Sequence, residues 1–297
     1  MIRITEKIPA FNGAAPGTQP TSQLVTRGRS YEYISLRAIG SGPAAAVLDF
    51  RNVISSVELL HNNKVESIFY PKEQRCFTDY RNANGDALPA DFMRIPLWRP
   101  GIPNSELGTA DLDSLTVRCN VVAALPASTT FTRIDGTCAY FQENANRDEY
   151  FVNTAITPPN ATPVVGTNVI ERMETGGLNK LAALYITAPP ALASLTDSTG
   201  LGISEAKVEV DGVTVFDQTR DDVNNFLAHS PIHYNLGGAQ FGFYIPLNAN
   251  NDARDFLNLV NPDGSRKFLK LTYVFAGTPA PMRILMAGTK GAPTAAK

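Results

Sequence analysis

Apolar and polar residues alternate over many short stretches of this chain, and turn residues separate the stretches. Examples are "SYEYISL" from Ser30, "AAVLDF" from Ala45, "FMRIPLW" from Phe92, "SLTVRCNVV" from Ser114 and "TFTRIDGTCAYF" from Thr130. A period of two is typical of strands with one buried face. The 22 glycines and 21 prolines are spread over the whole length, which favours many turns and few long helices. The pattern predicts an all-β protein with about seven or eight strands in each half.

One short motif occurs twice. Ile95-Pro96-Leu97 returns as Ile245-Pro246-Leu247, about 150 residues further along the chain. Because proline has no amide hydrogen to donate, each copy is expected at a strand end, a bulge or a sheet edge.

Other segments match in the same order, and the shift between partners stays between about 149 and 154 residues. The pairs are Thr26-Arg27-Gly28 with Thr175-Gly176-Gly177, Val57-Glu58-Leu59 with Val208-Glu209-Val210, "LTVRCNVVAALPA" with "LKLTYVFAGTPA", and Phe131-Thr132-Arg133-Ile134 with Pro281-Met282-Arg283-Ile284. So nearly constant a shift indicates a tandem duplication. The alternative is two independent β-domains that share turn residues.

Two polar segments also match, "YPKEQRCFTDYRN" and "DQTRDDVNNFLAHS". Both are interpreted as short helical insertions, in which Phe77, Tyr80 and Phe226 are the aromatic residues to bury. A chain of 297 residues suits two domains of about 150 residues each. The predicted domains are 1–157, an N-terminal extended arm with the first β-sandwich, and 158–297, a linker, the second β-sandwich and a C-terminal tail. The prolines of "TAITPPNATP" (154–163) indicate the linker.

A tight hairpin is predicted in "VEVDGVTV" (208–215), because Asp211-Gly212 suits the two positive-φ positions of a type I′ turn. In this register Val208 lies opposite Val215, and all four valines share a buried face. The corresponding turn of the first half is Asn62-Asn63, which is less well suited to positive φ.

The histidines and cysteines provide no clear active site or metal site. His229 and His233 have the spacing of helical zinc ligands, but a proline, Pro231, between them would break the helix. His61 stands beside the Asn62-Asn63 turn, and a turn role is expected for it. The three cysteines, Cys76, Cys119 and Cys138, are odd in number and lack C-x-x-C spacing, so buried free thiols are expected.

Several acidic residues are of a type that binds calcium, since carboxylate oxygens are its preferred ligands. These are Asp111, Asp113, Asp221, Asp222 and Asp252. The alternative for each is a solvated turn or a helix cap. Phosphate-binding loops and the serine-nucleophile motif are missing from the sequence. The prediction is therefore of a protein that is not an enzyme, with no catalytic residue, metal ligand or cofactor.

The charge of the chain argues against nucleic acid as a direct partner. The formal net charge is -2, with 26 basic and 28 acidic residues, so a global positive field is lacking. Basic residues gather weakly near the ends, with Arg3, Lys7, Arg27 and Arg29 near one terminus and Arg283, Lys290 and Lys297 near the other. No apolar run is long enough for a signal peptide or a membrane-spanning helix.

The tandem units resemble the double jelly-roll major capsid proteins of the adenovirus, tectivirus and corticovirus lineage. The resemblance is carried by "YEYISL" with "LAALYI", the hairpins at Val57 and Val208, the polar segments at Lys72 and Asp221, and the paired "IPL" motifs, and it covers residues 20 to 290. Because both units are short, the chain is most similar to the compact corticovirus-type coat proteins of membrane-containing icosahedral phages. The expected fold is two tandem eight-stranded jelly rolls with short helical insertions.

This resemblance implies a major capsid protein that forms homotrimeric, pseudo-hexagonal capsomers and tiles an icosahedral shell around an internal lipid membrane. Its expected partners are further copies of itself, minor capsid and vertex proteins, and the membrane, which the basic termini would face. An alternative is that "APGTQPTS" before Ser22 reaches a neighbouring subunit as an arm. The expected location is the virion, after synthesis in the host cytoplasm.

Proteins of other classes remain as alternatives. A tandem carbohydrate-binding or adhesin module would use an aromatic platform such as Trp98, and a viral spike protein would share the fold. A hydrolase would depend on residues such as Asp113 or His233.

Overall fold

The computed structural model describes residues 2–74, 89–99, 104–143, 148–158, 162–187, 202–228, 242–247, 256–277 and 281–291. Their contacts divide them into two compact units, one of residues 2–153 with residue 291 and one of residues 154–290. No helix in these ranges is long and apolar enough to cross a membrane.

The described residues of the first half form nine strands and two short helices with defined bounds. Their bounds are β1 (Arg3–Lys7), β2 (Thr21–Leu24), β3 (Arg29–Ser41), η1 (Pro43–Ala45), α1 (Phe50–Val53), β4 (Ile54–His61), β5 (Lys64–Phe69), β6 (Phe92–Pro96), β7 (Leu107–Gly108), β8 (Leu115–Val121) and β9 (Thr130–Gln142). Residues 71–74 are also helical.

The second half repeats this series. Its elements are β10 (Glu149–Ile156), β11 (Gly166–Ile170), β12 (Lys180–Thr187), β13 (Ile203–Val210), β14 (Val213–Thr219), α3 (Arg220–Ala228), β15 (Gly242–Pro246), β16 (Leu257–Asn258), β17 (Leu269–Phe275) and β18 (Arg283–Gly291).

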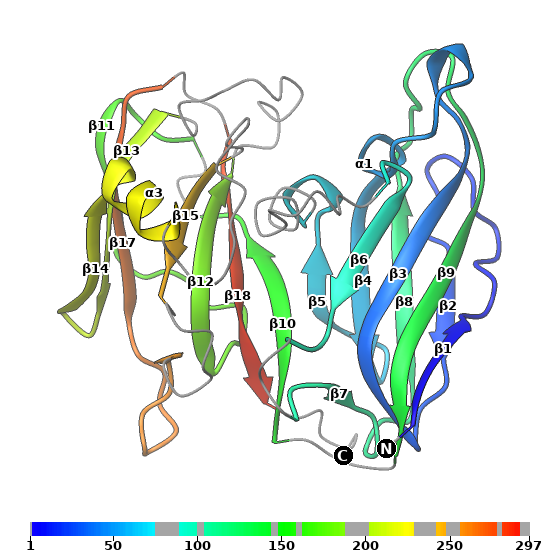
Figure 1. The fold of residues 1–297 in the computed structure, drawn as a ribbon, viewed down its shortest axis with the longest axis horizontal. Coiled ribbons are helices and arrows are strands. Elements are labelled where there is room, and N and C mark those ends of the chain that lie inside the picture. The colour runs from blue at the N-terminus through cyan, green and yellow to red at the C-terminus, as the bar shows by residue number, and fades with distance from the viewer. Residues whose placement is uncertain are drawn as a thin grey trace. The chain divides into compact units, whose positions relative to one another are not determined.

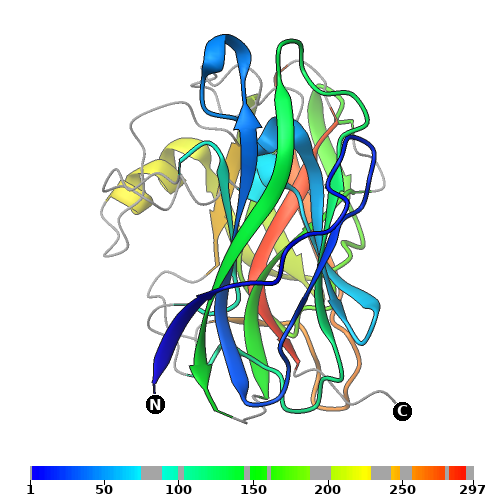
Figure 2. The same ribbon diagram turned by 90° about the vertical axis from the view of Figure 1, so that its right-hand side faces the viewer.

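The strand order is the same in both halves. In the first half, sheet A has the order β1-β9-β3-β6 and sheet B the order β2-β8-β4-β5. In the second half, sheet C has the order β10-β18-β12-β15 and sheet D the order β11-β17-β13-β14. Adding nine to each strand number of the first half gives its partner in the second, including the short strands β7 and β16. All pairings with a described register are antiparallel, as Figure 2 shows for β1 beside one end of β9.

Each half is therefore an eight-stranded jelly roll with one additional two-residue strand. The two sheets of a jelly roll pack face to face, and alternate residues of their strands form the core. Strand β8 shows this pattern clearly, because Leu115, Val117, Cys119 and Val121 are buried and the residues between them are partly exposed. Its partner β17 has the same burial pattern. The prediction of two tandem jelly rolls is confirmed.

The two Ile-Pro-Leu motifs occupy equivalent edge positions. Pro96 ends β6 and lies opposite Tyr33, and Pro246 ends β15 and lies opposite Ala183. The residue after each proline continues the pairing, since Leu97 donates to Glu32 and Leu247 to Ala182. Strands β6 and β15 each end a sheet, which is where proline costs no ladder hydrogen bond. The predicted edge position is confirmed in both halves.

Both hairpins have the expected type of turn. The φ angles are 50° and 65° at Asn62 and Asn63, and 50° and 80° at Asp211 and Gly212. Positive φ at both central positions is the property of a type I′ turn.

The predicted register beyond the second turn is wrong. A β-bulge follows the Glu209–Thr214 pair, so Val208 lies opposite Phe216 and not opposite Val215. The bulge turns Val215 outward, to 40% exposure, and Val213 beside the turn is 65% exposed. Only two of the four valines are buried, because Phe216 takes the core position that had been predicted for Val215. The first hairpin has its bulge at the equivalent place.

Three further expectations require correction. The segment "AAVLDF" is not a strand but contains the end of η1 and the start of α1, whose N-cap Asp49 accepts a hydrogen bond from Arg51 N. The predicted linker begins with three strand residues, since β10 extends to Ile156. Phe226 is 39% exposed, whereas burial was expected. Phe77 and Tyr80 lie outside the described residues.

The predicted N-terminal arm is also corrected, because much of it lies on the first jelly roll. Residues 3–7 form β1, which pairs with β9. In the "APGTQPTS" segment, Gly17 N donates to Val122 O, and the carbonyls of Thr18 and Pro20 accept from β8. The domain boundary at residues 157 and 158 stays a prediction.

Burial distinguishes the two equivalent sheets A and C. In sheet C, seven consecutive residues of β12 and of β18 are buried, so both faces of these adjacent strands (Figure 1) are covered. In sheet A, β9 keeps exposed or partly exposed residues over much of its length. Sheet A therefore keeps an accessible outer face.

Candidate assembly surfaces

The outer face of sheet A carries arginines stacked on aromatic rings. The guanidinium carbon of Arg94 lies 4.5 Å from the ring centre of Tyr33, and that of Arg37 lies 5.1 Å from the ring centre of Phe92. Strand pairing creates these stacks, because Arg37 lies directly opposite Phe92, and Arg94 is two residues from Pro96, the partner of Tyr33, and so lies on the same face. Arginine and aromatic residues are enriched in protein interfaces. This face has the composition of a binding surface.

A groove of about 460 Å³ opens on the same face. Strands β3, β6 and β9 and the segment after β1 form it, and we call it the basic groove, defined by Lys7, Ile8, Arg37, Phe92, Arg133 and Ile134. Glycine is required at position 136 of β9, because a Cβ there would lie 2.4 Å from Ile8 Cδ1. On the outer face the groove combines the ring of Phe92 with three cationic side chains and the carboxylate of Asp135, whereas Ile8 and Ile134 are buried on the core side.

The charges of the basic groove are only partly neutralised. Arg37 Nε lies 2.5 Å from Asp91 Oδ2, and Arg133 Nε lies 2.9 Å from Asp135 Oδ1. The hydrogen bonds that Arg133 donates to Asp135 raise the pKa of the Arg133 guanidinium. Lys7 forms no ion pair with any described residue. The groove therefore keeps a net positive charge.

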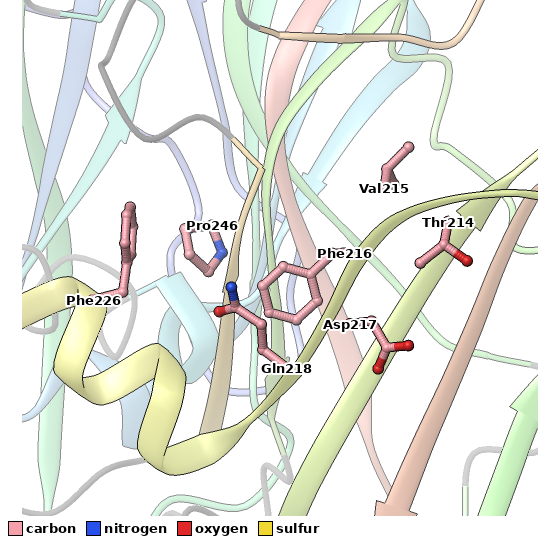
Figure 3. Close-up of a pocket in the computed structure, with 7 residues that line it drawn as sticks. All are labelled: Thr214, Val215, Phe216, Asp217, Gln218, Phe226 and Pro246. Carbon is pink, nitrogen blue, oxygen red and sulfur yellow. The ribbon is translucent and has the colours of Figure 1, made fainter.

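A second groove, of about 360 Å³, lies in the second jelly roll. Its lining residues are Thr214, Val215, Phe216, Asp217, Gln218, Phe226 and Pro246. Figure 3 shows the rings of Phe226, Pro246 and Phe216 in succession, from α3 past the end of β15 to β14. The exposure of Val215 and Phe226 leaves this edge apolar.

Helix α3 borders this second groove and begins with acidic residues. Asp222 Oδ2 accepts a hydrogen bond of 2.6 Å from Thr219 Oγ1, and Thr219 Oγ1 accepts one of 3.3 Å from Asp222 N. These bonds cap the first turn of the helix, so Asp222 has the cap role that was the alternative to calcium binding. Asp221 is exposed beside it. Negative charge at a helix N-terminus is also favoured by the helix dipole.

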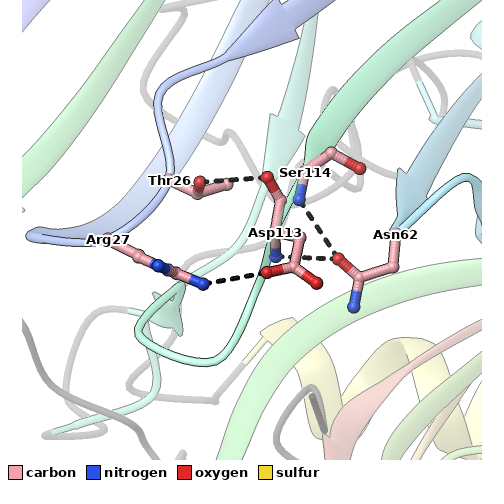
Figure 4. Close-up of polar contacts among 5 residues, drawn as sticks. All are labelled: Thr26, Arg27, Asn62, Asp113 and Ser114. Carbon is pink, nitrogen blue, oxygen red and sulfur yellow. Dashed lines mark hydrogen bonds and ion pairs between the residues drawn. The ribbon is translucent and has the colours of Figure 1, made fainter. Parts of the chain in front are cut away.

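The loops at one end of the first jelly roll are joined by Asn62 and Asp113 (Figure 4). Asn62 Oδ1 accepts from the backbone N of Asp113 at 2.9 Å and of Ser114 at 3.1 Å. Arg27 Nη2 lies 2.8 Å from Asp113 Oδ1, and Thr26 Oγ1 donates to the Asp113 carbonyl at 3.5 Å. Since Asp113 is paired with Arg27, its carboxylate is not poised for a metal ion.

The other candidate residues are placed as follows. In the described part of the chain, no three or more His, Cys, Asp or Glu residues gather where a metal ion could bind. His61 is buried at the end of β4, with its ring centre 6.0 Å from that of Tyr150, so it is a packed strand residue and not an exposed turn residue. Trp98 is half-buried. His229, His233, Asp252 and Cys76 lie outside the described residues.

Cys119 and Cys138 are buried free thiols, as predicted. Burial raises the pKa of both, to about 11 for Cys138. Neither thiol is activated as a nucleophile, because a reactive cysteine needs a lowered pKa.

The basic residues near the N-terminus are largely paired with acids. Arg3 Nε lies 2.5 Å from Glu32 Oε2, and Arg29 is bonded to Glu6. These ion pairs weaken the positive field that was expected there.

No protein-family model and no curated protein matches the chain in sequence. Solved structures do match in fold. The major capsid protein P2 from bacteriophage PM2 is similar with a TM-score of 0.72 and 15% identity, over 98% of this chain and 97% of that one. The MCP of Sulfolobus turreted icosahedral virus gives a TM-score of 0.65 and 9% identity, over 97% and 96%. A chain of the PBCV-1 virus capsid gives 0.61 and 12%, over 97% and 93%.

These likenesses extend over nearly the whole of each chain, so they include both halves of the duplication. At such low identities they establish the fold. The chain has the double jelly-roll fold that these viral capsid proteins share.

Proposed function

We propose that this chain is the major capsid protein of an icosahedral virus and that it assembles as a homotrimer. The observation that carries the proposal is the repetition of one strand order, β1 to β9 and β10 to β18, in a chain that matches capsid proteins end to end. Two similar units repeated three times around an axis present six similar sides. One protein can then tile a nearly hexagonal lattice through related contacts.

In this proposal the role is structural and not catalytic. The partners are further copies of the chain in a virion shell, together with minor capsid and vertex proteins, and synthesis occurs in the host cytoplasm. The net charge of -2 suits a coat that does not neutralise the genome itself.

The trimer is tested with purified protein by sedimentation velocity and cryo-electron microscopy. The expected species has three times the mass of one chain and a six-sided outline. Permanent subunit interfaces should each bury more than about 1,600 Å². A stable monomer at concentrations up to about 100 µM, well above the dissociation constant of a permanent complex, would contradict the proposal.

An internal lipid membrane beneath the shell is a separate part of the proposal. With Arg3 and Arg29 paired to acids, the positive charge that remains near the N-terminus includes Lys7. Each basic residue near anionic lipid contributes about 1 kcal/mol, so binding to vesicles by this terminus should be weak and salt-sensitive. Flotation with vesicles containing phosphatidylglycerol tests it, with phosphatidylcholine vesicles as the control. Absence of flotation on both, by trimers as well as monomers, would count against contact with lipid.

A further inference from the structure

We infer that helix α3 of one copy docks into the basic groove of a second copy, an inference that rests on the self-assembly proposed above. The helix offers Asp221, Asp222 and Phe226, and the groove offers three cations beside the ring of Phe92. The contact joins the second jelly roll of one chain to the first jelly roll of the next.

The charges of the two surfaces are complementary. Asp221 and Asp222 are exposed in the first turn of α3, and no described basic side chain forms an ion pair with either. The groove carries Lys7, Arg37 and Arg133, of which Lys7 is without an acidic partner in the described ranges. Opposite potentials across an interface speed association and select the partner.

The apolar parts of the two surfaces also correspond. Phe226 is 39% exposed, although it is the largest apolar side chain in the described part of α3. It lies one helical turn after Asp222, so the two share a face of the helix. Phe92 lies on the same face of sheet A as its cross-strand partner Arg37, where the groove of about 460 Å³ can receive Phe226. Buried aromatic residues are frequent anchors of interfaces.

Among the residues that the structure describes, each surface occurs once, although the fold is duplicated. Thr187 and Gly242 are the second-half counterparts of Arg37 and Phe92, because they form the equivalent strand pair. Thr187 is fully buried, so sheet C offers no equivalent groove at this place. In the first half, the helical residues Glu73 and Gln74 are buried, so this helical turn does not expose its polar side chains to a second copy as α3 does.

A chain with one donor surface and one acceptor surface makes a head-to-tail contact. Such a contact joins unlike surfaces and closes into a ring when the rotation between copies permits. The inferred contact therefore suits a cyclic trimer.

Photo-crosslinking identifies the partner surface directly. Phe226 is replaced by p-benzoylphenylalanine, and a mixture of ¹⁵N-labelled and unlabelled protein is irradiated and analysed by mass spectrometry. The expected crosslink joins α3 to a peptide that contains residues 7–10, 35–37, 92 or 133–137 of another copy. The same amino acid at Phe268, which is 55% exposed elsewhere in the second jelly roll, is the control. Intermolecular crosslinks from position 226 to other peptides only, or none from a proven trimer, would overturn the inference.

Charge exchange tests the ionic part. Lys7→Glu and Asp221→Lys should each weaken self-association by about tenfold or more, because like charges then meet. The double variant Lys7→Glu/Asp221→Lys should recover association, since every copy again carries complementary surfaces. Lys64→Glu and Glu174→Lys, at exposed positions away from both surfaces, are the matched controls. Arg37 is left unchanged because its partner Asp91 is buried.

The outcomes separate this inference from the proposed function. If the wild-type chain forms trimers and the Lys7 and Asp221 variants form them equally well, the inferred contact is wrong and the proposed function stands. If the wild-type chain never self-associates, both fail. Circular dichroism of each variant shows whether a loss of association reflects loss of the fold.

Discussion

Asn62 and Asp211 form the same pair of hydrogen bonds in the two jelly rolls. Asn62 N donates to Ser114 O, and Asn62 Oδ1 accepts from Ser114 N at 3.1 Å. Asp211 N donates to Phe268 O, and Asp211 Oδ1 accepts from Phe268 N at 2.8 Å. Each residue is the first of a hairpin turn, and its partner lies just before the strand that pairs with the hairpin. The duplication therefore extends from strand order to individual side-chain bonds.

Replacement of Asp211 tests the contribution of this bond. Asp211→Ala should lower the free energy of unfolding by about 1 kcal/mol, because the Phe268 amide loses its acceptor. Asp211→Asn should change it by less than about 0.5 kcal/mol, since an amide oxygen accepts in the same place, as at Asn62. Urea denaturation measures both. Equal losses for the two variants would show that the carboxylate charge, and not the hydrogen bond, is important.

Removing glycine from the second turn and introducing it into the first turn should change stability in opposite directions. At Gly212, φ is +80° and a Cβ would meet nothing within 4 Å, so Gly212→Ala adds backbone strain alone. The expected loss is about 1 to 2 kcal/mol. Asn63, with φ of 65°, carries part of this strain, and Asn63→Gly should be neutral or stabilise by up to about 1 kcal/mol. Thermal unfolding of both variants provides the comparison, and stabilisation by Gly212→Ala would contradict it.

A steric test is available at the pairing of β12 with β18. A Cβ at Gly288 would lie 2.0 Å from the Lys180 carbonyl oxygen, beside the irregularity between Leu181 and Ala183. Gly288→Ala should therefore destabilise by about 3 kcal/mol or more, because backbone must move. Gly42→Ala is the control, since its nearest contact would be 3.4 Å. Soluble, fully stable Gly288→Ala protein would show that the strands separate at little cost.

Stability should fall in alkaline solution. Burial raises the pKa of Tyr273 from about 10 to about 12. The folded state favours the neutral phenol. Its contribution to the free energy of unfolding is therefore complete below pH 10 and is lost as the pH rises through 12. The difference between the folded and unfolded pKa of Tyr273 corresponds to about 2 to 3 kcal/mol of stability. Burial also raises the pKa of Tyr31 and of Tyr150, which adds to the same loss.

Tyr273→Phe should make this alkaline loss shallower, as measured by urea unfolding from pH 8 to pH 12. Tyr33→Phe, on the half-exposed outer face of sheet A, controls for removal of a hydroxyl. Identical pH profiles for wild type and Tyr273→Phe would contradict the assignment.

The buried thiols should be unreactive in the folded protein. At pH 8, iodoacetamide should modify neither Cys119 nor Cys138, and both should react in urea. Exclusion of the reagent and a raised pKa both reduce the thiolate that reacts. Peptide mapping by mass spectrometry distinguishes the two sites, and rapid native labelling of Cys138 would indicate that β9 opens.

The sequence predicted those features of the fold that depend on local chemistry. Alternation along β8 predicted a strand with one buried face, and the Asp211-Gly212 pair predicted a tight turn. The repeated Ile-Pro-Leu motif indicated the duplication. The register of the second hairpin was missed because a bulge that exposes Val215 depends on packing by Phe216, which a strict period of two does not anticipate.

The candidate surfaces could not be predicted in this way. Lys7, Arg37 and Arg133 are far apart in sequence and meet only because β1 and β3 both pair with β9. Likewise, the sequence of the segment predicts a helix that buries its aromatic residue. The exposure of Phe226 depends on how α3 lies at the edge of sheet D, which the segment alone does not determine.

The prolines that end β6 and β15 have a consequence for the behaviour of the protein at high concentration. An open sheet edge can recruit a strand from any passing chain and start a fibre. Pro96 and Pro246 each remove a donor from an outer edge, on β6 and on β15, so continuous strand addition is interrupted there. In the proposed shell, copies then join through side chains and not through strand pairing, which favours a closed particle over an endless ribbon.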